Sequence, residues 1–155
     1  MNLVIGADHA GFEHKAKLIK LLKESGHNIT DVGTDSSESC DYTDFGIKGA
    51  ELVSRRKADF GILICGAGIG MSITANKFRG VRAAVCWNEE SAAITRVHNN
   101  SNIICIGARF FTADECMKMI KVFLKTPASK EPRHIRRVNK IIALEERESI
   151  CNGKT

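Results

Sequence analysis

The chain has 155 residues, of which 43% are hydrophobic and 26% are charged, with two prolines and no low-complexity tract. This composition excludes a disordered chain and indicates one compact domain. The formal net charge of +5 favours an anionic partner, either a phosphorylated metabolite or a nucleic acid, and does not choose between them.

The N-terminal residues carry no basic leader, and their apolar run is too short for a signal peptide or a membrane span. We therefore expect a cytoplasmic protein that does not bind membranes. Aromatic residues make up only 6% of the chain, and no nucleic-acid-binding motif is present. A nucleic acid is therefore the less favoured anionic partner.

Short apolar runs alternate with segments of helical periodicity. A strand over 3–8 is followed by a helix whose apolar stripe begins at Phe12 and which ends before Gly26, a C-cap residue. The pattern then predicts further strands and helices in the order strand 28–33, helix 42–56, strand 59–65, helix 70–78, strand 81–86, helix 88–98, strand 102–107 and helix 112–125. Each of these strands is predicted to be buried.

A last helix begins near residue 129, with Pro132 in its first turn and an apolar stripe formed by Ile135, Val138 and Ile142. Alternating strands and helices indicate βαβ units with right-handed crossovers. The sequence therefore predicts a three-layer α/β/α sandwich around a Rossmann-like, five-stranded parallel sheet, with an extra C-terminal helix.

The six cysteines do not form a disulfide or metal pattern. Cys40, Cys65, Cys86, Cys105, Cys116 and Cys151 are scattered, without a C-x-x-C pair or a His/Cys pair at zinc-site spacing. We expect most of them to be ordinary buried thiols, and we expect no metal site. Cys65 needs separate consideration because of the loop that follows it.

Reactive side chains follow several of the predicted strands. Asp8 and His9 come after the first strand, Cys65 to Gly70 after the third, and Gly107 to Arg109 after the fifth. In parallel α/β sheets, ligands bind outside the carboxyl ends of the strands. We therefore expect a binding site at this edge, although Asp8 would alternatively only cap the next helix.

The stretch "ILICGAGIGMS", residues 62–72, is not a nucleotide motif. Its glycines give G-x-G-x-G in place of the dinucleotide pattern G-x-G-x-x-G, and no G-K-[ST] follows. Glycines before a helix N-terminus still form a nest of N–H groups that binds an anion. That anion is either a bound phosphate or an oxyanion formed during a reaction.

Three further features have two interpretations each. Cys65 is either a buried residue at a strand end or a nucleophile or general base activated by the helix N-terminus. The segment His98-Asn99-Asn100 is either structural or brought to the same edge of the sheet. The basic cluster around Arg133 and Arg137 is either a solvated helix face or a phosphate grip.

Six segments in this order resemble the type B ribose-5-phosphate isomerases, a group within the sugar-phosphate isomerase family that includes galactose-6-phosphate and allose-6-phosphate isomerases. They are "GADHAGFEHK", "DVGT", "DYTDFG", "ILICGAGIGMSITANKFRGVRAAVC", "RVHNNSNIICIGAR" and "RHIRRV". The resemblance implies one isomerase domain over residues 1–147, with residues 148–155 as a C-terminal tail.

The resemblance also implies an activity and a site. The activity is interconversion of D-ribose 5-phosphate and D-ribulose 5-phosphate through an enediolate, in the non-oxidative pentose phosphate pathway. It needs no metal, nucleotide or other cofactor, and it takes place in homodimers whose active sites use both chains, with a tetramer as an alternative.

Cys65 would move the proton, His98 would open the sugar ring, and Gly66, Ala67, Gly68, Ile69 and Gly70 would hold the enediolate. Asp8, Tyr42 and Asn99 would contact sugar hydroxyls, and His9, Arg109, Arg133 and Arg137 would bind the phosphate.

One position departs from the family pattern. Ala67 stands where relatives usually carry Ser or Thr, so any hydrogen bond through that hydroxyl is absent. Met71 occupies the position where a related subfamily has a glutamate base, which assigns this chain to the cysteine type. Two alternatives stay open: an isomerase of a six-carbon sugar phosphate, and a non-catalytic sensor of sugar phosphates or nucleotides.

Overall fold

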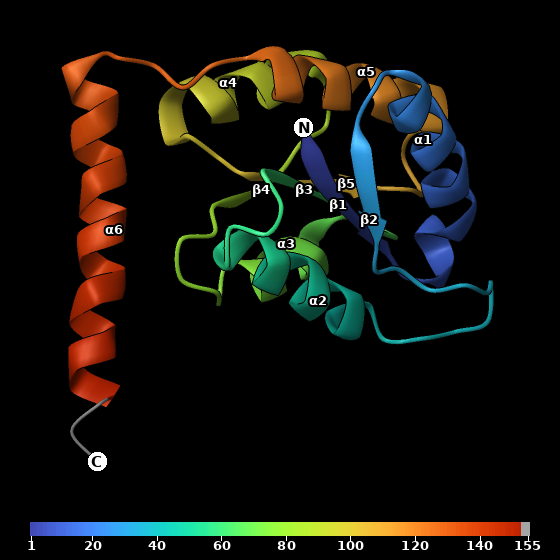
Figure 1. Cartoon of the computed structure of the whole chain (residues 1–155), viewed down its shortest axis with the longest axis horizontal. Helices are drawn as coiled ribbons and strands as arrows, with labels where there is room; N and C mark the ends of the chain where they lie inside the picture. The colour runs from blue at the N-terminus through green and yellow to red at the C-terminus, as the bar shows by residue number, and fades with distance from the viewer. Residues whose placement is uncertain (153–155) are drawn as a thin grey trace.

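Strands and helices alternate along the chain as predicted. The computed structural model describes the backbone of residues 1–152 and the side chains of residues 1–147. In chain order the elements are β1 (Asn2–Ala7), a short 3-10 turn η1 (His9–Gly11), α1 (Phe12–Glu24), β2 (Asn28–Asp31), α2 (Tyr42–Ser54), β3 (Phe60–Cys65), α3 (Ile69–Ala75), β4 (Ala83–Val85), α4 (Glu89–Asn99), β5 (Ile103–Gly107), α5 (Ala113–Lys125) and α6 (Pro132–Asn152) (Figure 1). The sandwich and its extra helix are confirmed.

The five strands form one parallel sheet in the order β2-β1-β3-β5-β4. Helices α1, α4 and α5 cover one face, and α2 and α3 cover the other (Figure 1). From β1 the chain first adds β2 on one side and then crosses back to add β3 on the other side. The carboxyl ends of β1 and β3 are therefore the topological switch point, where this architecture binds ligands. Asp8 directly follows β1, and Cys65 ends β3.

Alternate residues of the central strands enter two separate cores. In β3, Ile62 and Ile64 pack in the core beneath α1 and α5, whereas Leu63 and Cys65 pack in the core beneath α2 and α3. Burial on both faces explains why these strands are continuously apolar. The prediction that every strand is buried is wrong for the two edge strands. Three of the four residues of β2 are exposed, and the three residues of β4 are only partly buried.

Helix α6 stands beside the β4 edge of the sheet, outside the two helical layers (Figure 1). It contacts the C-terminal end of α4, where the ring of His134 packs on that of His98. The helix continues to Asn152, beyond the predicted start of the tail at residue 148, and residues 153–155 lie outside the described residues. None of the described helices is long and apolar enough to cross a membrane.

A buried arginine fixes the junction between α4 and α6. Arg96 is only 8% exposed, and its guanidinium donates to the carbonyl oxygens of Ser101 at 2.5 Å and Thr126 at 3.1 Å. It also lies over the rings of Phe60 and Phe123, at 4.8 and 5.6 Å from their centroids. Burial lowers the pKa of this guanidinium, and the charge of Arg82 lowers it further. The cation thus ties the end of α4 to the connection that leads to α6.

We predict that Arg96→Met destabilises the fold by about 2–4 kcal/mol, because the substitution leaves one buried and one partly buried carbonyl oxygen without their donor. Urea unfolding measures the change. Arg55→Met is the matched control, because Arg55 is exposed and pairs only with Glu51 along the surface of α2, which contributes about 0.3–0.5 kcal/mol. Equal costs for the two substitutions would contradict the anchoring role of Arg96.

Candidate active site

A cavity of about 400 Å³ lies at the carboxyl ends of the central strands. It gathers residues from the turn after β1, the end of β3 and the loop after it, α2, α3 and the segment after β5. Its lining residues are Asp8, His9, Ala10, Tyr42, Cys65, Gly66, Ala67, Ile69, Gly70, Ile73 and Arg109. Most of the side chains that the sequence predicted for the site therefore meet at the predicted edge of the sheet.

Cys65 is held by the turn that follows it. The backbone N–H of Gly68 donates to Cys65 Sγ at 3.1 Å, and the side chain of Cys65 is 5% exposed. Gly68 has φ = +77°, and an added Cβ would lie 2.9 Å from the carbonyl carbon of Ile106. Only glycine combines this conformation with such a close approach to β5. Gly68 itself lies behind the cavity and does not line it.

The turn leads directly into α3. The first helical hydrogen bond runs from Ser72 N–H to the carbonyl oxygen of Gly68 at 3.1 Å. The N–H groups of Ile69 and Gly70 therefore precede the helical ladder, beside the cavity that both residues line. A nest of N–H donors next to a sulfur atom stabilises negative charge on that sulfur or on an anion bound beside it.

The other buried thiols have surroundings that keep them protonated. Burial raises the pKa of Cys86 to about 12 and that of Cys116 to about 11, and it raises the pKa of Cys105 well above its usual value. None of these three lines the cavity. The cysteines whose side chains are described are free thiols, and all of them except Cys40 are buried, as predicted for most of the cysteines. Cys151 lies outside that part of the chain.

Asp8 caps a turn and also lines the cavity. Its Oδ1 atom accepts from the N–H groups of Ala10 at 3.0 Å and Gly11 at 3.2 Å, so it caps the turn η1. It also lines the cavity while being only 5% exposed. The neighbouring His9 is fixed from the other side, because its Nδ1 accepts the backbone N–H of Cys40 at 3.2 Å.

Two larger side chains cover the glycine loop. The ring of Tyr42, at the start of α2, lies so close to Gly70 that an added Cβ there would be 2.5 Å from ring carbons. The guanidinium of Arg109 lies over Gly66, with Nε 3.1 Å from the position of a Cβ. The backbone N–H of Arg109 also donates to the Gly66 carbonyl oxygen at 3.1 Å. The loop is thus packed between an aromatic ring and a cation.

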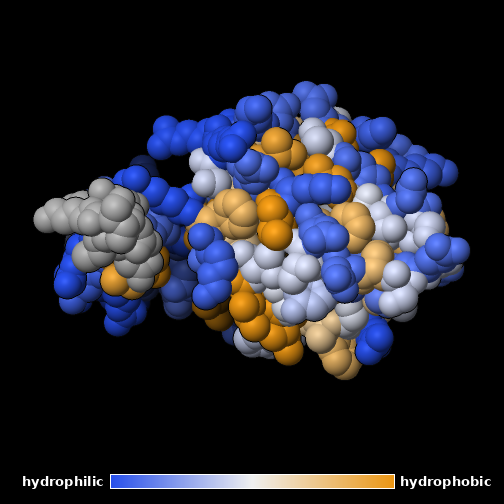
Figure 2. All heavy atoms as spheres, turned by 90° about the horizontal axis from the view of Figure 1, so that it is seen from below, coloured by the Kyte–Doolittle hydropathy of each residue, from blue (hydrophilic) through white to orange (hydrophobic). Residues whose placement is uncertain are grey.

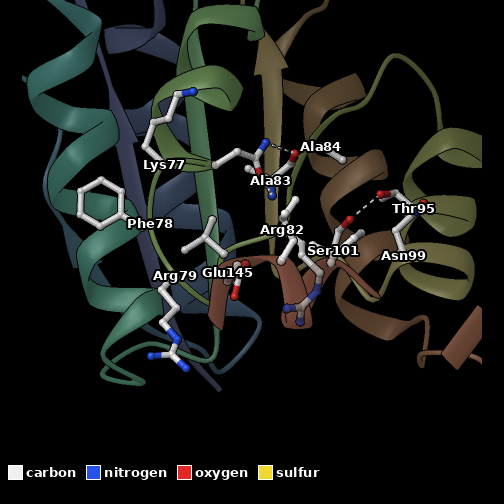
Figure 3. A pocket seen from close by; sticks show the side chains of 14 residues that line it. Lys77, Phe78, Arg79, Arg82, Ala83, Ala84, Thr95, Asn99, Ser101 and Glu145 are labelled. Carbon is white, nitrogen blue, oxygen red and sulfur yellow. Dashed lines mark hydrogen bonds between the residues drawn. The ribbon is translucent and has the colours of Figure 1, made fainter. Parts of the chain in front are cut away.

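Four predicted site residues lie elsewhere in the chain. His98 lines a cavity of about 170 Å³ between α4 and α6 and packs on His134, with ring centroids 4.3 Å apart. Asn99 lines a cleft of about 660 Å³ between β4 and α6, together with Thr95 and Ser101 (Figure 3). Arg133 and Arg137 are exposed on α6.

The expectation that one chain brings His98 and Asn99 to the edge that holds Cys65 is therefore not met. In a βαβ unit the helix runs antiparallel to the strands, so α4 ends at the amino edge of the sheet. Strands of five or six residues separate the two edges by about 15–20 Å.

Three further residues lie around these cavities and are not among the site residues predicted from the sequence. Ile73 lies one turn after Ile69 on α3, and helical spacing would have found it. His134 is buried, with an Nδ1 atom that has no partner among the described residues, and loss of hydration and then the charges of His98 and Arg133 lower its pKa. Cys40 carried no signal, because it lies 31 positions from His9 in a loop.

No group of three or more His, Cys, Asp or Glu side chains within the described residues has the arrangement of a metal site. The cavity itself offers a thiol beside a nest of N–H donors, a carboxylate, an imidazole, a phenol and a guanidinium. These groups suit the binding of an anionic, hydroxylated ligand and the transfer of a proton.

Comparison with known proteins gives matches that cover most of the chain. A family described as Ribose/Galactose Isomerase matches residues 3–141. Ribose-5-phosphate isomerase B of Mycolicibacterium paratuberculosis is 41% identical over 148 residues, covering 95% of this chain and 92% of the relative. A solved structure of ribose-5-phosphate isomerase B from Clostridium thermocellum superposes with a TM-score of 0.91 at 42% identity, covering 96% and 99% of the two chains. That from Mycoplasma genitalium, with bound ribulose-5-phosphate, has a TM-score of 0.89 at 39% identity, covering 94% and 96%.

We predict that Gly70→Ala displaces the ring of Tyr42, because the new methyl group would overlap it. Tyr42 is the only tyrosine, so its ring resonances in an NMR spectrum report the movement without ambiguity. The cost in stability stays below about 1 kcal/mol, since the overlapping atoms are the far end of a half-exposed side chain.

Gly66→Ala is the matched control for this substitution. Its methyl group would meet the guanidinium of Arg109, so the resonances of Tyr42 should match those of the wild type. Unchanged Tyr42 resonances in Gly70→Ala would contradict the packing described for the loop.

Proposed function

The chain belongs to the ribose/galactose isomerase family, and from this premise we infer that it interconverts D-ribose 5-phosphate and D-ribulose 5-phosphate. The observation that carries the proposal is the position of Cys65 Sγ, 3.1 Å from the Gly68 N–H and in the wall of a cavity that also holds cationic and hydroxyl-bearing side chains. The relatives quoted above are named for the five-carbon sugar, which favours this substrate over a six-carbon sugar phosphate. Their names also favour an enzyme over a non-catalytic sensor.

The proposed reaction is a proton transfer between neighbouring carbons. Cys65, as thiolate, removes the proton from carbon 2 of the open-chain aldose, and the electron pair of that C–H bond forms the C1–C2 double bond. The carbonyl π electrons move to oxygen 1, which gives an enediolate. The proton then returns to carbon 1, and oxygen 2 becomes the new carbonyl while its proton passes to oxygen 1. No redox partner is needed, because the carbon that is oxidised and the carbon that is reduced belong to one molecule.

The glycine loop would stabilise the charge that this step creates. The N–H groups of Ile69 and Gly70 lie outside the helical ladder and beside Cys65, where they can donate to the enediolate oxygens. One well-placed donor of this kind lowers a barrier by about 3–4 kcal/mol. Asp8 and Tyr42 in the same wall would hold the sugar hydroxyls. Ala67 lines the cavity without a hydroxyl group, so in this proposal the base and the N–H donors act without one.

The phosphate would lie beside His9 and Arg109, which both line the cavity. Arg133 and Arg137, four residues apart on an exposed face of α6, would complete its binding from a second copy of the chain. His98 would act on the closed form of the sugar from the same second copy, and Asn99 would contact its hydroxyls. We propose a homodimer with two shared sites because one chain holds these groups at opposite edges of its sheet.

Exposed apolar surfaces support this assembly. Ile69 and Ile73 on α3 are 57% and 60% exposed, and Leu144 on α6 is 55% exposed. Figure 2 shows apolar side chains gathered on the α2 and α3 face. Apolar area of this kind is typical of a surface that another protein covers. A two-fold axis would place α6 of one copy against α3 of the other, next to the cavity that contains Cys65.

Two expectations from the sequence stay predictions. One is a single isomerase domain over residues 1–147, and the other is a location in the cytoplasm.

We predict that Cys65→Ala lowers kcat for ribose 5-phosphate by about 10²–10⁴-fold, the usual contribution of a positioned base. Exchange of the carbon 2 proton into deuterated water, followed by NMR, should fall by the same factor. Cys116→Ala is the matched control, because it removes a buried thiol that does not line the cavity. Full exchange in Cys65→Ala would exclude the thiol as the base.

The shared site predicts complementation between two inactive variants. Cys65→Ala and the double variant Arg133→Ala/Arg137→Ala each damage both sites of a homodimer, but a mixed dimer contains one site with Cys65 and both arginines intact. Random pairing on co-expression should restore about a quarter of the wild-type activity.

Steady-state rates of the purified mixture measure this recovery. Arg136→Ala in place of the double variant is the control, because Arg136 has no assigned role and its own homodimers should be active. An activity no greater than the sum of the two separate variants would contradict a site built from two chains.

A further inference from the structure

A loop of residues 32–41 carries a backbone donor to a histidine of the cavity. The loop joins β2 to α2 and passes along the carboxyl edge of the sheet (Figure 1). The backbone N–H of Cys40 donates to His9 Nδ1 at 3.2 Å, and Cys40 Sγ lies 3.9 Å from the same nitrogen. No residue of this loop lines the cavity, so Cys40 acts on the cavity only through His9.

The loop holds Cys40 in place from both ends. At its start, Thr34 is buried, and its N–H donates to the carbonyl oxygen of Ala7 at 2.9 Å, at the end of β1. The hydroxyl of Thr34 also accepts the N–H of Ser36 at 3.3 Å and so shapes the first turn. At its other end, Asp41 is the N-cap residue of α2. The Cys40 N–H thus belongs to a segment fixed to both β1 and α2.

This hydrogen bond selects one tautomer of His9. A nitrogen that accepts a hydrogen bond carries no proton, and in a neutral imidazole the proton is then on the other nitrogen. With Nδ1 engaged by Cys40, the proton is on Nε2, and Nε2 is the ring nitrogen left to contact a ligand. An Nε2–H group is a donor, as a phosphate oxygen requires, whereas the alternative tautomer would present a lone pair to an anion.

We propose that Cys40 is a positioning residue, whose backbone N–H fixes His9 in the Nε2–H tautomer and so prepares it to donate to the phosphate of the substrate. The part of this proposal that concerns phosphate rests on the function proposed above, whereas the tautomer does not. The thiol is not the active group, because an N–H at 3.2 Å is a stronger donor to nitrogen than an S–H at 3.9 Å.

The wild-type protein allows a direct test of the hydrogen bond. In uniformly ¹⁵N-labelled protein, a scalar coupling across the hydrogen bond between the Cys40 nitrogen and His9 Nδ1 is expected. Long-range ¹H–¹⁵N spectra should show His9 as the Nε2–H tautomer, with His9→Asn used to assign its signals among those of the five histidines. Absence of the coupling together with a protonated Nδ1 would overturn the proposal without any substitution at Cys40.

Three loop variants distinguish the effect of the Cys40 N–H on the His9 tautomer from the effect of the Cys40 thiol and from the general effect of a proline in the loop. Cys40→Pro removes the donor, so His9 should become a mixture of tautomers, and KM for ribose 5-phosphate should rise about 3–10-fold with kcat changed less than about twofold. Cys40→Ala keeps the N–H and should keep the wild-type tautomer. Ser39→Pro places a proline one residue earlier without removing this donor, and it should also keep that tautomer.

The outcomes distinguish this proposal from the proposed function. A pure Nε2–H tautomer in Cys40→Pro, or a tautomer mixture in Cys40→Ala, overturns the role of the Cys40 N–H even if the enzyme isomerises ribose 5-phosphate normally. A protein that shows the predicted tautomers but no turnover of ribose 5-phosphate refutes the proposed function and leaves the positioning of His9 by Cys40 established.

Discussion

The site depends on a close contact between two backbones. Gly68 packs against the carbonyl carbon of Ile106 and the amide of Gly107 with a positive φ, and a side chain at this position would push β5 away from the loop. This contact allows the chain to turn between the end of β3 and the start of α3 within a few residues. The Gly68 N–H then points at Cys65 Sγ, and the next N–H groups stay outside the helical ladder. The proposed base and the proposed oxyanion donors are therefore consequences of a single turn.

Burial separates the roles of the cysteines. Cys86, Cys105 and Cys116 lie in cores where loss of hydration raises the thiol pKa, which makes them poor bases near neutral pH. Cys65 belongs to the core under α3 as well, but it ends its strand, so its sulfur meets the loop and the cavity. Successive side chains of a strand point to opposite faces of the sheet, so Leu63 and Cys65 of β3 lie on the same face. Of these two residues, only Cys65 lies at the carboxyl edge.

The direction of the helices explains why a complete site needs two chains in our proposal. Every crossover helix returns the chain to the amino edge of the sheet, so the end of α4 cannot lie near the end of β3 in the same molecule. Arg96 fixes the end of α4, and α6 leaves the sandwich from that region, which places His98 and the arginines of α6 on one side. A symmetric partner is a simple way to bring the two edges together.

The sequence by itself determined the order of the elements, the parallel sheet, the turn at Gly68 and the loop after Cys65, because these follow from local periodicity and from glycine chemistry. It also predicted the residues that follow β1, β3 and β5, since strand ends of a parallel sheet share an edge. Only the tertiary structure decided that β2 is exposed, that Cys40 holds His9, and that His98 packs on His134 away from Cys65. Those outcomes depend on edge position in the sheet and on contacts between residues distant in the chain, which no local pattern records.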